Sequence, residues 1–145
     1  MPLKDIIRTR DELVTATEDE SCETLAKRMH DKKVGSVVVE RDDRPVGIVT
    51  DRDLCIHCVA EGKDAKNTPA KDVMNSKVHT VEGDTGVYEA CKAMREHSVR
   101  RLPVTENGRL AGIVTVDDML VLLEDEMHDL SDVVRAESPP YEKPA

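Results

Sequence analysis

The chain of 145 residues contains no phenylalanine and no tryptophan, and its two tyrosines are Tyr88 and Tyr141. Many nucleic-acid sites use aromatic rings as platforms on which a base stacks. Any base that this chain binds must therefore lie against aliphatic side chains. The core must likewise be built from Val, Leu, Ile, Met, Ala and Cys, within a hydrophobic share of 39%.

Long apolar runs and clustered positive charge are also missing. No apolar run approaches the roughly 20 residues of a membrane span, and the first five residues contain no signal-peptide core. The formal charge of -9 disfavours nonspecific binding to nucleic acids and to anionic membranes. We therefore expect a cytoplasmic protein that binds neither nucleic acid nor membrane.

The sequence does contain an internal repeat, at an offset of 65 residues. Residues 34–39 align with residues 99–104, and residues 47–53 align with residues 112–118. The register holds without a gap over most of the chain. We conclude that the chain is a duplicated unit.

Each copy begins with the same local pattern. Short extended segments at residues 13–16 and 78–81 are followed by an apolar helical face with i, i+3, i+4, i+7 spacing. Asp19, Asp84 and Ser21 are candidates for the helix caps. The two predicted faces are Cys22, Leu25, Ala26 and Met29 in the first copy, and Val87, Ala90, Cys91 and Met94 in the second.

A β-hairpin and a second helix complete each copy. Asn107-Gly108 is a strong signal for a tight turn in the second copy, and Asp42-Asp43 takes its place in the first. A second helix is predicted to begin near the acidic residue that follows each hairpin. The fold class is therefore α/β (α+β), with two β-α-β-β-α units. Because each unit is too small to bury both faces of its sheet, the units should pack around a pseudo-twofold axis.

Four segments carry a resemblance to a known family. The CBS-domain family, named after cystathionine β-synthase, is similar to this chain at residues 33–39, 45–54, 99–104 and 108–115. The resemblance implies tandem CBS repeats. We expect a first CBS domain at 1–62, a linker at 63–70, a second CBS domain with an extended C-terminal helix at 71–135, and a flexible tail at 136–145.

The resemblance also implies a function. Family members often bind AMP, ADP, ATP or S-adenosylmethionine in the clefts between repeats, and two pairs commonly associate. We therefore expect a non-catalytic, energy-sensing regulatory module that forms a homodimer and acts on a regulated protein partner, with no cofactor and no metal. Two alternatives stay open: a ligand-independent structural or interaction module, and a small hydrolase or redox enzyme.

The family's ribose motif is Gly, two apolar residues, Thr or Ser, two variable residues and Asp. A carboxylate can accept hydrogen bonds from both hydroxyls of a ribose, and a Thr hydroxyl at a helix start lies where a phosphate would bind. Thr-x-x-Asp also resembles a capping box, which needs no ligand. The two copies of the motif are Gly47, Thr50 and Asp53, and Gly112, Thr115 and Asp118.

Further binding residues are expected on either side of these motifs. Arg100 and Arg101 are candidates for phosphate, because a guanidinium matches the paired oxygens of that group. The first copy has Gly35-Ser36 at the same positions, so the two clefts should not be equivalent. In the family, the first extended segment meets the adenine, and this region contains Thr15, Ala16, Thr80 and Val81.

Cys55 and Cys58 form a CxxC motif with His57 between them, a pattern that can bind metal or do redox chemistry. The repeat favours another interpretation. Each of the four cysteines aligns with an apolar residue in the other copy. We therefore predict that all four are small buried hydrophobic residues with reduced thiols.

The last helix has a longer apolar pattern than its counterpart in the first copy. Its stripe consists of Met119, Leu123, Met127, Leu130 and Val134. This stripe could pack within the chain, across a dimer or against a partner helix, and the sequence leaves these alternatives open.

Overall fold

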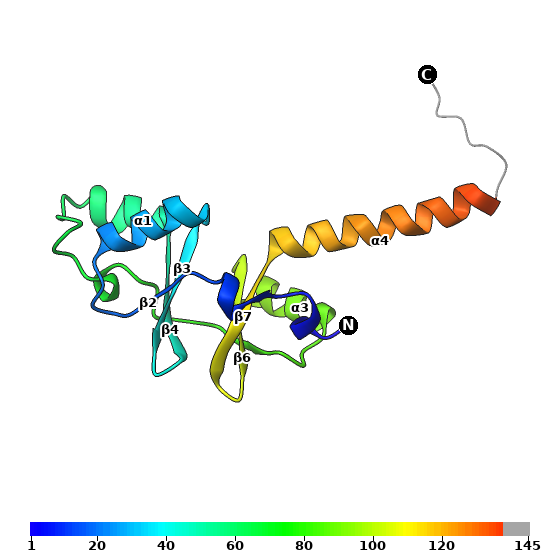
Figure 1. The fold of residues 1–145 in the computed structure, drawn as a ribbon, viewed down its shortest axis with the longest axis horizontal. Helices are drawn as coiled ribbons and strands as arrows, with labels where there is room; N and C mark the ends of the chain where they lie inside the picture. The colour runs from blue at the N-terminus through cyan, green and yellow to red at the C-terminus, as the bar shows by residue number, and fades with distance from the viewer. Residues whose placement is uncertain (138–145) are drawn as a thin grey trace, which may run out of the picture. The chain divides into compact units, whose positions relative to one another are not determined.

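The computed structural model describes residues 1–137 and divides into two compact units, residues 1–114 and the chain from residue 115 onward. The first unit contains both sheets, and the second is formed by one long helix (Figure 1). The predicted flexible tail lies, from residue 138, outside the described residues.

The first repeat forms a three-stranded sheet in the order β2-β3-β4. β2 pairs in parallel with β3, and β3 pairs with β4 as an antiparallel hairpin. The short α2 continues directly into the π-helical turn η3. The elements are β2 (Thr15–Ala16), α1 (Cys22–Lys32), β3 (Ser36–Arg41), β4 (Arg44–Thr50), α2 (Asp51–Leu54) and η3 (Cys55–Val59).

The second repeat has the same order of elements, and its sheet has the order β1-β7-β6-β5, in which β1 (Arg8–Thr9) comes from the N-terminal segment. The predicted fold class, α/β with two β-α-β-β-α repeats, is confirmed. The final helix is much longer than its counterpart in the first repeat. The elements are β5 (Val81–Glu82), α3 (Val87–His97), β6 (Arg101–Glu106), β7 (Arg109–Thr115) and α4 (Val116–Glu137).

The segment that opens each repeat packs on the other repeat, which the sequence did not predict. The N-terminal segment, with η1 (Leu3–Asp5), bridges Pro2 to Gly86 at the start of α3. The segment with η4 (Ala70–Asp72) bridges Pro69 to Ser21 at the start of α1. Leu3 and Ala70 are both fully buried. Each repeat is therefore completed by the opening segment of the other repeat, and we call these two equivalent segments the exchanged segments.

The N-terminal exchange also adds a strand to the second sheet. β1 (Arg8–Thr9) pairs antiparallel with β7, opposite Ile113 and Gly112. The 3-10 helix η2 (Arg10–Glu12) then leads the chain back to the first repeat, where the side chain of Arg10 donates two hydrogen bonds of 2.8 Å to Glu40.

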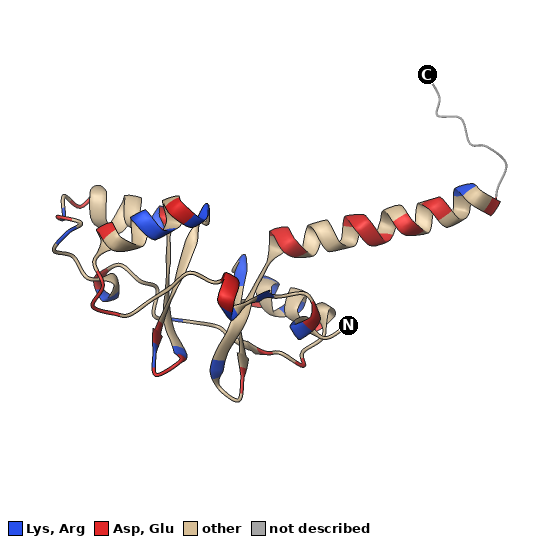
Figure 2. Cartoon of the chain, viewed as in Figure 1, with Lys and Arg blue, Asp and Glu red and all other residues tan. Residues whose placement is uncertain are grey.

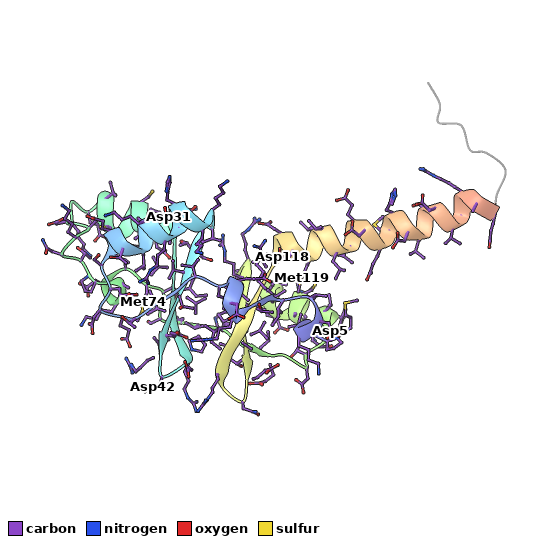
Figure 3. All side chains as sticks on the ribbon, viewed as in Figure 1. Asp5, Asp31, Asp42, Met74, Asp118 and Met119 are labelled. Carbon is purple, nitrogen blue, oxygen red and sulfur yellow. The ribbon has the colours of Figure 1, made fainter. Side chains whose placement is uncertain are left out.

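Gly47 and Gly112 make these exchanges possible. A Cβ on Gly47 would overlap the side chain of Met74, which is labelled in Figure 3. A Cβ on Gly112 would overlap the backbone oxygen of Arg8 and lie 2.7 Å from Cδ1 of Ile7. The glycine of each predicted ribose motif therefore has a structural role, because it leaves room for the exchanged segment.

Strand β3 is buried on both faces, which explains its continuous run of valines. Val37 and Val39 face the core beneath α1, where they share a cluster with Leu25. Val38 faces the other way and packs with Leu110 and Ile113 of the second repeat. The two sheets therefore share an apolar contact inside the first unit.

The two hairpin turns have equivalent backbone geometry despite their different sequences. Asp42 and Asp43 have φ values of 52° and 63°, and Asn107 and Gly108 have values of 54° and 79°. Figure 3 shows Asp42 at the tip of its hairpin. The backbone N–H of Leu110 donates a 2.7 Å hydrogen bond to the carbonyl of Asp43, so the second hairpin contacts the first.

The helix caps differ from the sequence prediction in part. Ser21 caps α1 by accepting a hydrogen bond from the backbone N–H of Thr24 at 3.2 Å. Asp19 instead forms an ion pair with Lys71, so its predicted capping role is wrong. The N-cap of α3 is Gly86, which has no side chain, and the prediction of Asp84 as a cap is also wrong.

The predicted helical faces are narrower than expected. Leu25 and Met29 are buried in α1, and Ala90 and Met94 are buried in α3. The i+4 position of each predicted face is exposed; this position is Ala26 in the first copy and Cys91 in the second. It lies at the edge of the face, where it turns toward solvent.

The prediction that all four cysteines are buried is wrong for two of them. Cys22 and Cys58 are buried, whereas Cys55 and Cys91 are exposed. In η3 the backbone N–H of Ala60 bonds to the carbonyl of Cys55, five residues earlier. This wider turn places Cys55 and Cys58 on different faces. Burial, with the neighbouring Cys58 thiol as a second cause, raises the pKa of Cys22 to about 11.

Candidate functional site

A cleft with a volume of about 180 Å³ opens between the two repeats within the first unit. Its lining comes from the end of β4, the segment between η4 and β5, and the start of β6. Small-molecule sites typically measure about 300–1,000 Å³, so this open cleft would enclose part of a nucleotide. It is lined by Ile48, Thr50, Asn75, Lys77, Val78, His79, Val99, Arg100 and Arg101.

One wall of the cleft is aliphatic. Ile48 comes from the first repeat, and Val78 and Val99 come from the second. All three side chains are partly buried. This wall matches the expectation that a base would lie against aliphatic groups, since the chain has almost no aromatic residues.

The polar part of the cleft is cationic. Lys77, Arg100 and Arg101 are among its nine lining residues, and none of the nine is Asp or Glu. In a chain with a formal charge of -9, this is a local reversal of sign. Arginine and lysine together suit a phosphate, because arginine offers a planar pair of donors and lysine a compact charge.

Arg101 reaches toward the first repeat. A Cβ built on Gly35 would lie 3.5 Å from a guanidinium nitrogen of Arg101 and 3.4 Å from a carboxylate oxygen of Asp51. The absence of a side chain at Gly35 thus leaves space for Arg101 beside the start of α2. In the alignment of the repeats, Gly35 corresponds to Arg100 and Ser36 to Arg101, so Arg101 lies beside the residue that precedes its own counterpart.

Thr50 and Asp53 form a capping box at the start of α2. The backbone N–H of Asp53 donates to Thr50 Oγ1 at 3.1 Å, and the backbone N–H of Thr50 donates to Asp53 Oδ2 at 2.9 Å. Thr50 also lines the cleft, whereas Asp53 is not one of the lining residues. The capping interpretation of Thr-x-x-Asp therefore describes the geometry in the first repeat.

In the second repeat, the backbone N–H of Asp118 donates to Thr115 Oγ1 at 3.1 Å. Both residues belong to the second unit, so their role in ligand binding stays a prediction. Figure 3 labels Asp118 and the buried Met119 in the first turn of α4.

The other predicted residues lie on the first strands of the repeats. Thr15 and Ala16 in β2 pair with Val38 and Val39, and Ala16 is buried. Val81 in β5 pairs with Val104, and Thr80 is exposed directly before it. The cleft thus brings together Thr50, Arg100 and Arg101 from the predicted set, and the other seven residues are not in its lining.

Sequence reasoning missed Asn75, Lys77 and His79. His79 lies in the predicted extended segment 78–81, whose start lines the cleft while Thr80 and Val81 do not, but Asn75 and Lys77 precede that segment and had no such signal. His79 also stacks on His97 at the end of α3, with 3.6 Å between ring centroids and 10° between ring planes. This contact fixes one side of the cleft against a helix.

Residues 1–137 contain no group of three or more His, Cys, Asp or Glu side chains that could hold a metal ion. Within the same residues, no helix has the length and apolar character needed to cross a membrane.

The fold and the cleft define a class of protein, the paired-repeat modules in which two β-α-β-β-α units enclose clefts between them. The family model for the CBS domain matches this chain twice, at residues 3–59 and 70–125. The chain therefore belongs to the CBS-domain family, and its repeats form a CBS pair, a regulatory type of module.

Two curated relatives illustrate the similarity. An uncharacterized protein of Methanopyrus kandleri is 42% identical over 113 residues, which cover 77% of this chain and 58% of that protein. Hypoxic response protein 1 of Mycobacterium tuberculosis is 34% identical over 103 residues, which cover 70% of this chain and 72% of that protein. The chain thus spans little more than half of the first relative's length.

Solved structures agree in fold. The crystal structure of Hypoxic Response Protein I, described with two coordinated zinc ions, matches with a TM-score of 0.75 at 30% identity and covers 83% of this chain and 97% of its own. A CBS domain pair crystallised with 5′-methylthioadenosine and S-adenosyl-L-methionine matches with a TM-score of 0.77, and the match covers 87% of this chain and 98% of that one. At 23% identity, the second match shows the fold alone.

Proposed function

We propose that this CBS pair binds an adenosine-containing ligand in the cleft between its repeats and transmits that binding to a partner protein or a homodimer. The observation that carries the proposal is the composition of the cleft, in which an aliphatic wall faces Thr50, Lys77, Arg100 and Arg101. A flat apolar base and an anionic phosphate need these two environments next to each other. The related fold that was crystallised with two adenosyl compounds supports the same ligand class.

The charge of the cleft favours AMP, ADP or ATP over S-adenosylmethionine. Three cationic side chains line it, and S-adenosylmethionine carries a positive sulfonium and no phosphate. A charge-assisted hydrogen bond from arginine to phosphate contributes about 1.5–3 kcal/mol, whereas a sulfonium in the same place would be repelled.

The cleft is suited to regulation because both repeats contribute to it. Ile48 and Thr50 come from the first repeat, and Val99, Arg100 and Arg101 come from the second. A bound ligand would favour one arrangement of the repeats. It can shift the equilibrium between arrangements only by its difference in affinity for them.

The alternative is a structural or interaction module that binds no ligand. One observation favours it: the carboxylate of Asp53 is engaged in the capping box, and Asp53 is not among the residues that line the cleft. In that case, substitution of Asp53 by Ala would cost only the energy of a cap, about 1 kcal/mol.

Thermal unfolding in the presence of AMP, ADP, ATP, S-adenosylmethionine and 2′-deoxy-AMP separates the two functions. A ligand at about 100 times its Kd adds roughly 2.7 kcal/mol to stability, and the midpoint rises by several degrees. We expect the phosphorylated nucleotides to raise the midpoint more than S-adenosylmethionine does. If no compound changes the midpoint at millimolar concentration, the interaction module is the better description.

A further inference from the structure

Helix α4 continues beyond the part of the chain that matches the CBS family. The second family match ends at residue 125, and α4 continues to Glu137. In the first repeat, α2 and η3 together end at Val59, the equivalent of Glu124. The last three turns of α4 therefore have no counterpart in the first repeat.

This helix has a stripe of exposed apolar side chains. Leu120, Leu123, Met127, Leu130 and Val134 are 44–68% exposed and are spaced by 3, 4, 3 and 4 residues. That spacing places them in one narrow seam, as in the a and d positions of a coiled coil. Of the stripe predicted from the sequence, Met119 is buried and the other four residues are exposed. Within the described residues, these four side chains of the seam are exposed.

A partner is needed to cover this seam. In proteins, helices owe little of their stability to propensity and most of it to packing of an apolar face. Contiguous exposed apolar surface on a soluble protein also marks interaction sites. The seam runs over four turns of helix, long enough to accept a second helix along its length.

The charge of α4 selects the kind of partner. The helix carries eight carboxylates and one arginine, Arg135, and Figure 2 shows acidic residues along its whole length. Glu124 and Glu126 lie on opposite sides of Met127 at the edges of the seam, as helical spacing requires. Two copies of α4 side by side would bring like charges together, whereas a basic helix would bring opposite charges together.

We propose that residues 120–137 of α4 form a docking surface for a basic amphipathic helix of a partner protein. The apolar face of that helix covers Leu123, Met127 and Leu130, and its lysines or arginines lie against Glu124 and Glu126. None of the residues of this surface is among those that line the cleft.

The test uses the full chain and a designed helical peptide of three heptads, with leucine at a and d and lysine at e and g. Its affinity is measured by fluorescence anisotropy at low and at high salt. We expect binding that weakens as salt rises, because the carboxylates contribute to it. A peptide with glutamate at e and g, and a scrambled lysine peptide of the same composition, should each bind at least about tenfold weaker.

The matched variants are Met127→Gln with Leu130→Gln, and Val59→Gln as the control. All three side chains are exposed, so these substitutions should leave the fold intact, which circular dichroism checks. We expect the double variant to bind the lysine peptide about tenfold or more weakly, because it removes two apolar contacts. Val59→Gln should leave the affinity for the peptide unchanged. Equal binding by the double variant, or equal binding of the scrambled peptide, overturns the proposal.

Sedimentation velocity of the free chain tests the competing occupant. The proposal expects the same oligomeric state for the wild type and the double variant. If the wild type forms a dimer that the double variant converts to monomers, a second copy of α4 covers the seam and the proposal is wrong.

Discussion

Position 36 is serine in the first repeat, and the equivalent position 101 is arginine in the second. Ser36 begins β3 and Arg101 begins β6, so the two residues occupy matching places in the fold. Arg101 lines the cleft between the repeats, together with Arg100, whose counterpart is Gly35. The second repeat thus provides both arginines, and Gly35 of the first repeat leaves space beside Arg101.

The residues that build the scaffold are much more alike between the repeats. Gly47 and Gly112 each leave room for an exchanged segment, and Leu3 and Ala70 are each buried by that exchange. The comparison teaches that these equivalent glycines and buried apolar residues maintain the fold that the two repeats share. The residues that differ between the repeats include Arg100 and Arg101, which contribute to the charge of the cleft.

The largest effect is expected from filling the two glycine positions. In Gly112→Ala, the new Cβ would overlap the backbone oxygen of Arg8, which can move only with β1. In Gly47→Ala, it would overlap the flexible side chain of Met74. We expect Gly112→Ala to lower the free energy of unfolding by about 3 kcal/mol and Gly47→Ala by about 1 kcal/mol. Urea unfolding measures both.

Equal losses for the two alanine variants would show that the exchanged segments are equally rigid, and would contradict the difference between backbone and side-chain contacts on which the prediction rests.

A second difference between the repeats lies in their cores, where Cys22 occupies the place of Val87. Because the folded state raises the pKa of Cys22 from 9.0 to about 11, the folded protein retains a proton that the unfolded chain loses. The Cys22 thiol makes its full contribution to the free energy of unfolding below pH 9, and this contribution is lost as the pH rises toward 11. Cys22→Val should remove this part of the alkaline loss, on the order of 2 kcal/mol.

Free energies of unfolding between pH 8 and pH 11 test this prediction, with Cys55→Ser at an exposed position as the control. If Cys22→Val and the wild type lose stability in parallel, burial of the thiol is not the cause of the alkaline loss.

The smallest effect is expected at the helix caps. Ser21 caps α1 with its hydroxyl, whereas Gly86 caps α3 with no side chain. Ser21→Ala should cost about 1 kcal/mol, and Gly86→Ser should stabilise the protein by a few tenths of a kcal/mol. A Cβ on Gly86 meets no atom within 4 Å among the described residues, so the new side chain has room. A loss of stability in Gly86→Ser would contradict the prediction, and thermal unfolding measures both variants.

The sequence predicted the elements well because their signals are local. The spacing of Leu25 and Met29 sets one face of α1, and Asn107-Gly108 sets the tight turn between β6 and β7. It did not predict which sheet β1 would join. A short strand such as Arg8–Thr9 has no local signal for its partner, and that choice depends on tertiary contacts.

The site residues were predicted only in part, because only some of them carry a local signal in the sequence. Arg100 and Arg101 could be found because a guanidinium suits a phosphate and because they lie in a segment that resembles the family, and Thr50 because it belongs to a family motif. Lys77 and His79 lie in the segment before β5, outside the short motifs that carried the resemblance. The exposure of Cys55 could not be predicted, since it depends on the π-helical turn of η3.

The central claim is that the arginines of the second repeat make the cleft a nucleotide site, and calorimetric titration with AMP tests it most directly. The titration compares the wild type with Arg101→Ser, which restores the residue of the first repeat, and with Arg109→Ser as an exposed control outside the cleft lining. The account predicts that AMP binds the wild type and Arg109→Ser alike, and binds Arg101→Ser about 10- to 100-fold more weakly, the equivalent of one charge-assisted hydrogen bond. Binding of AMP with the same affinity in Arg101→Ser, or no binding to the wild type, would contradict it.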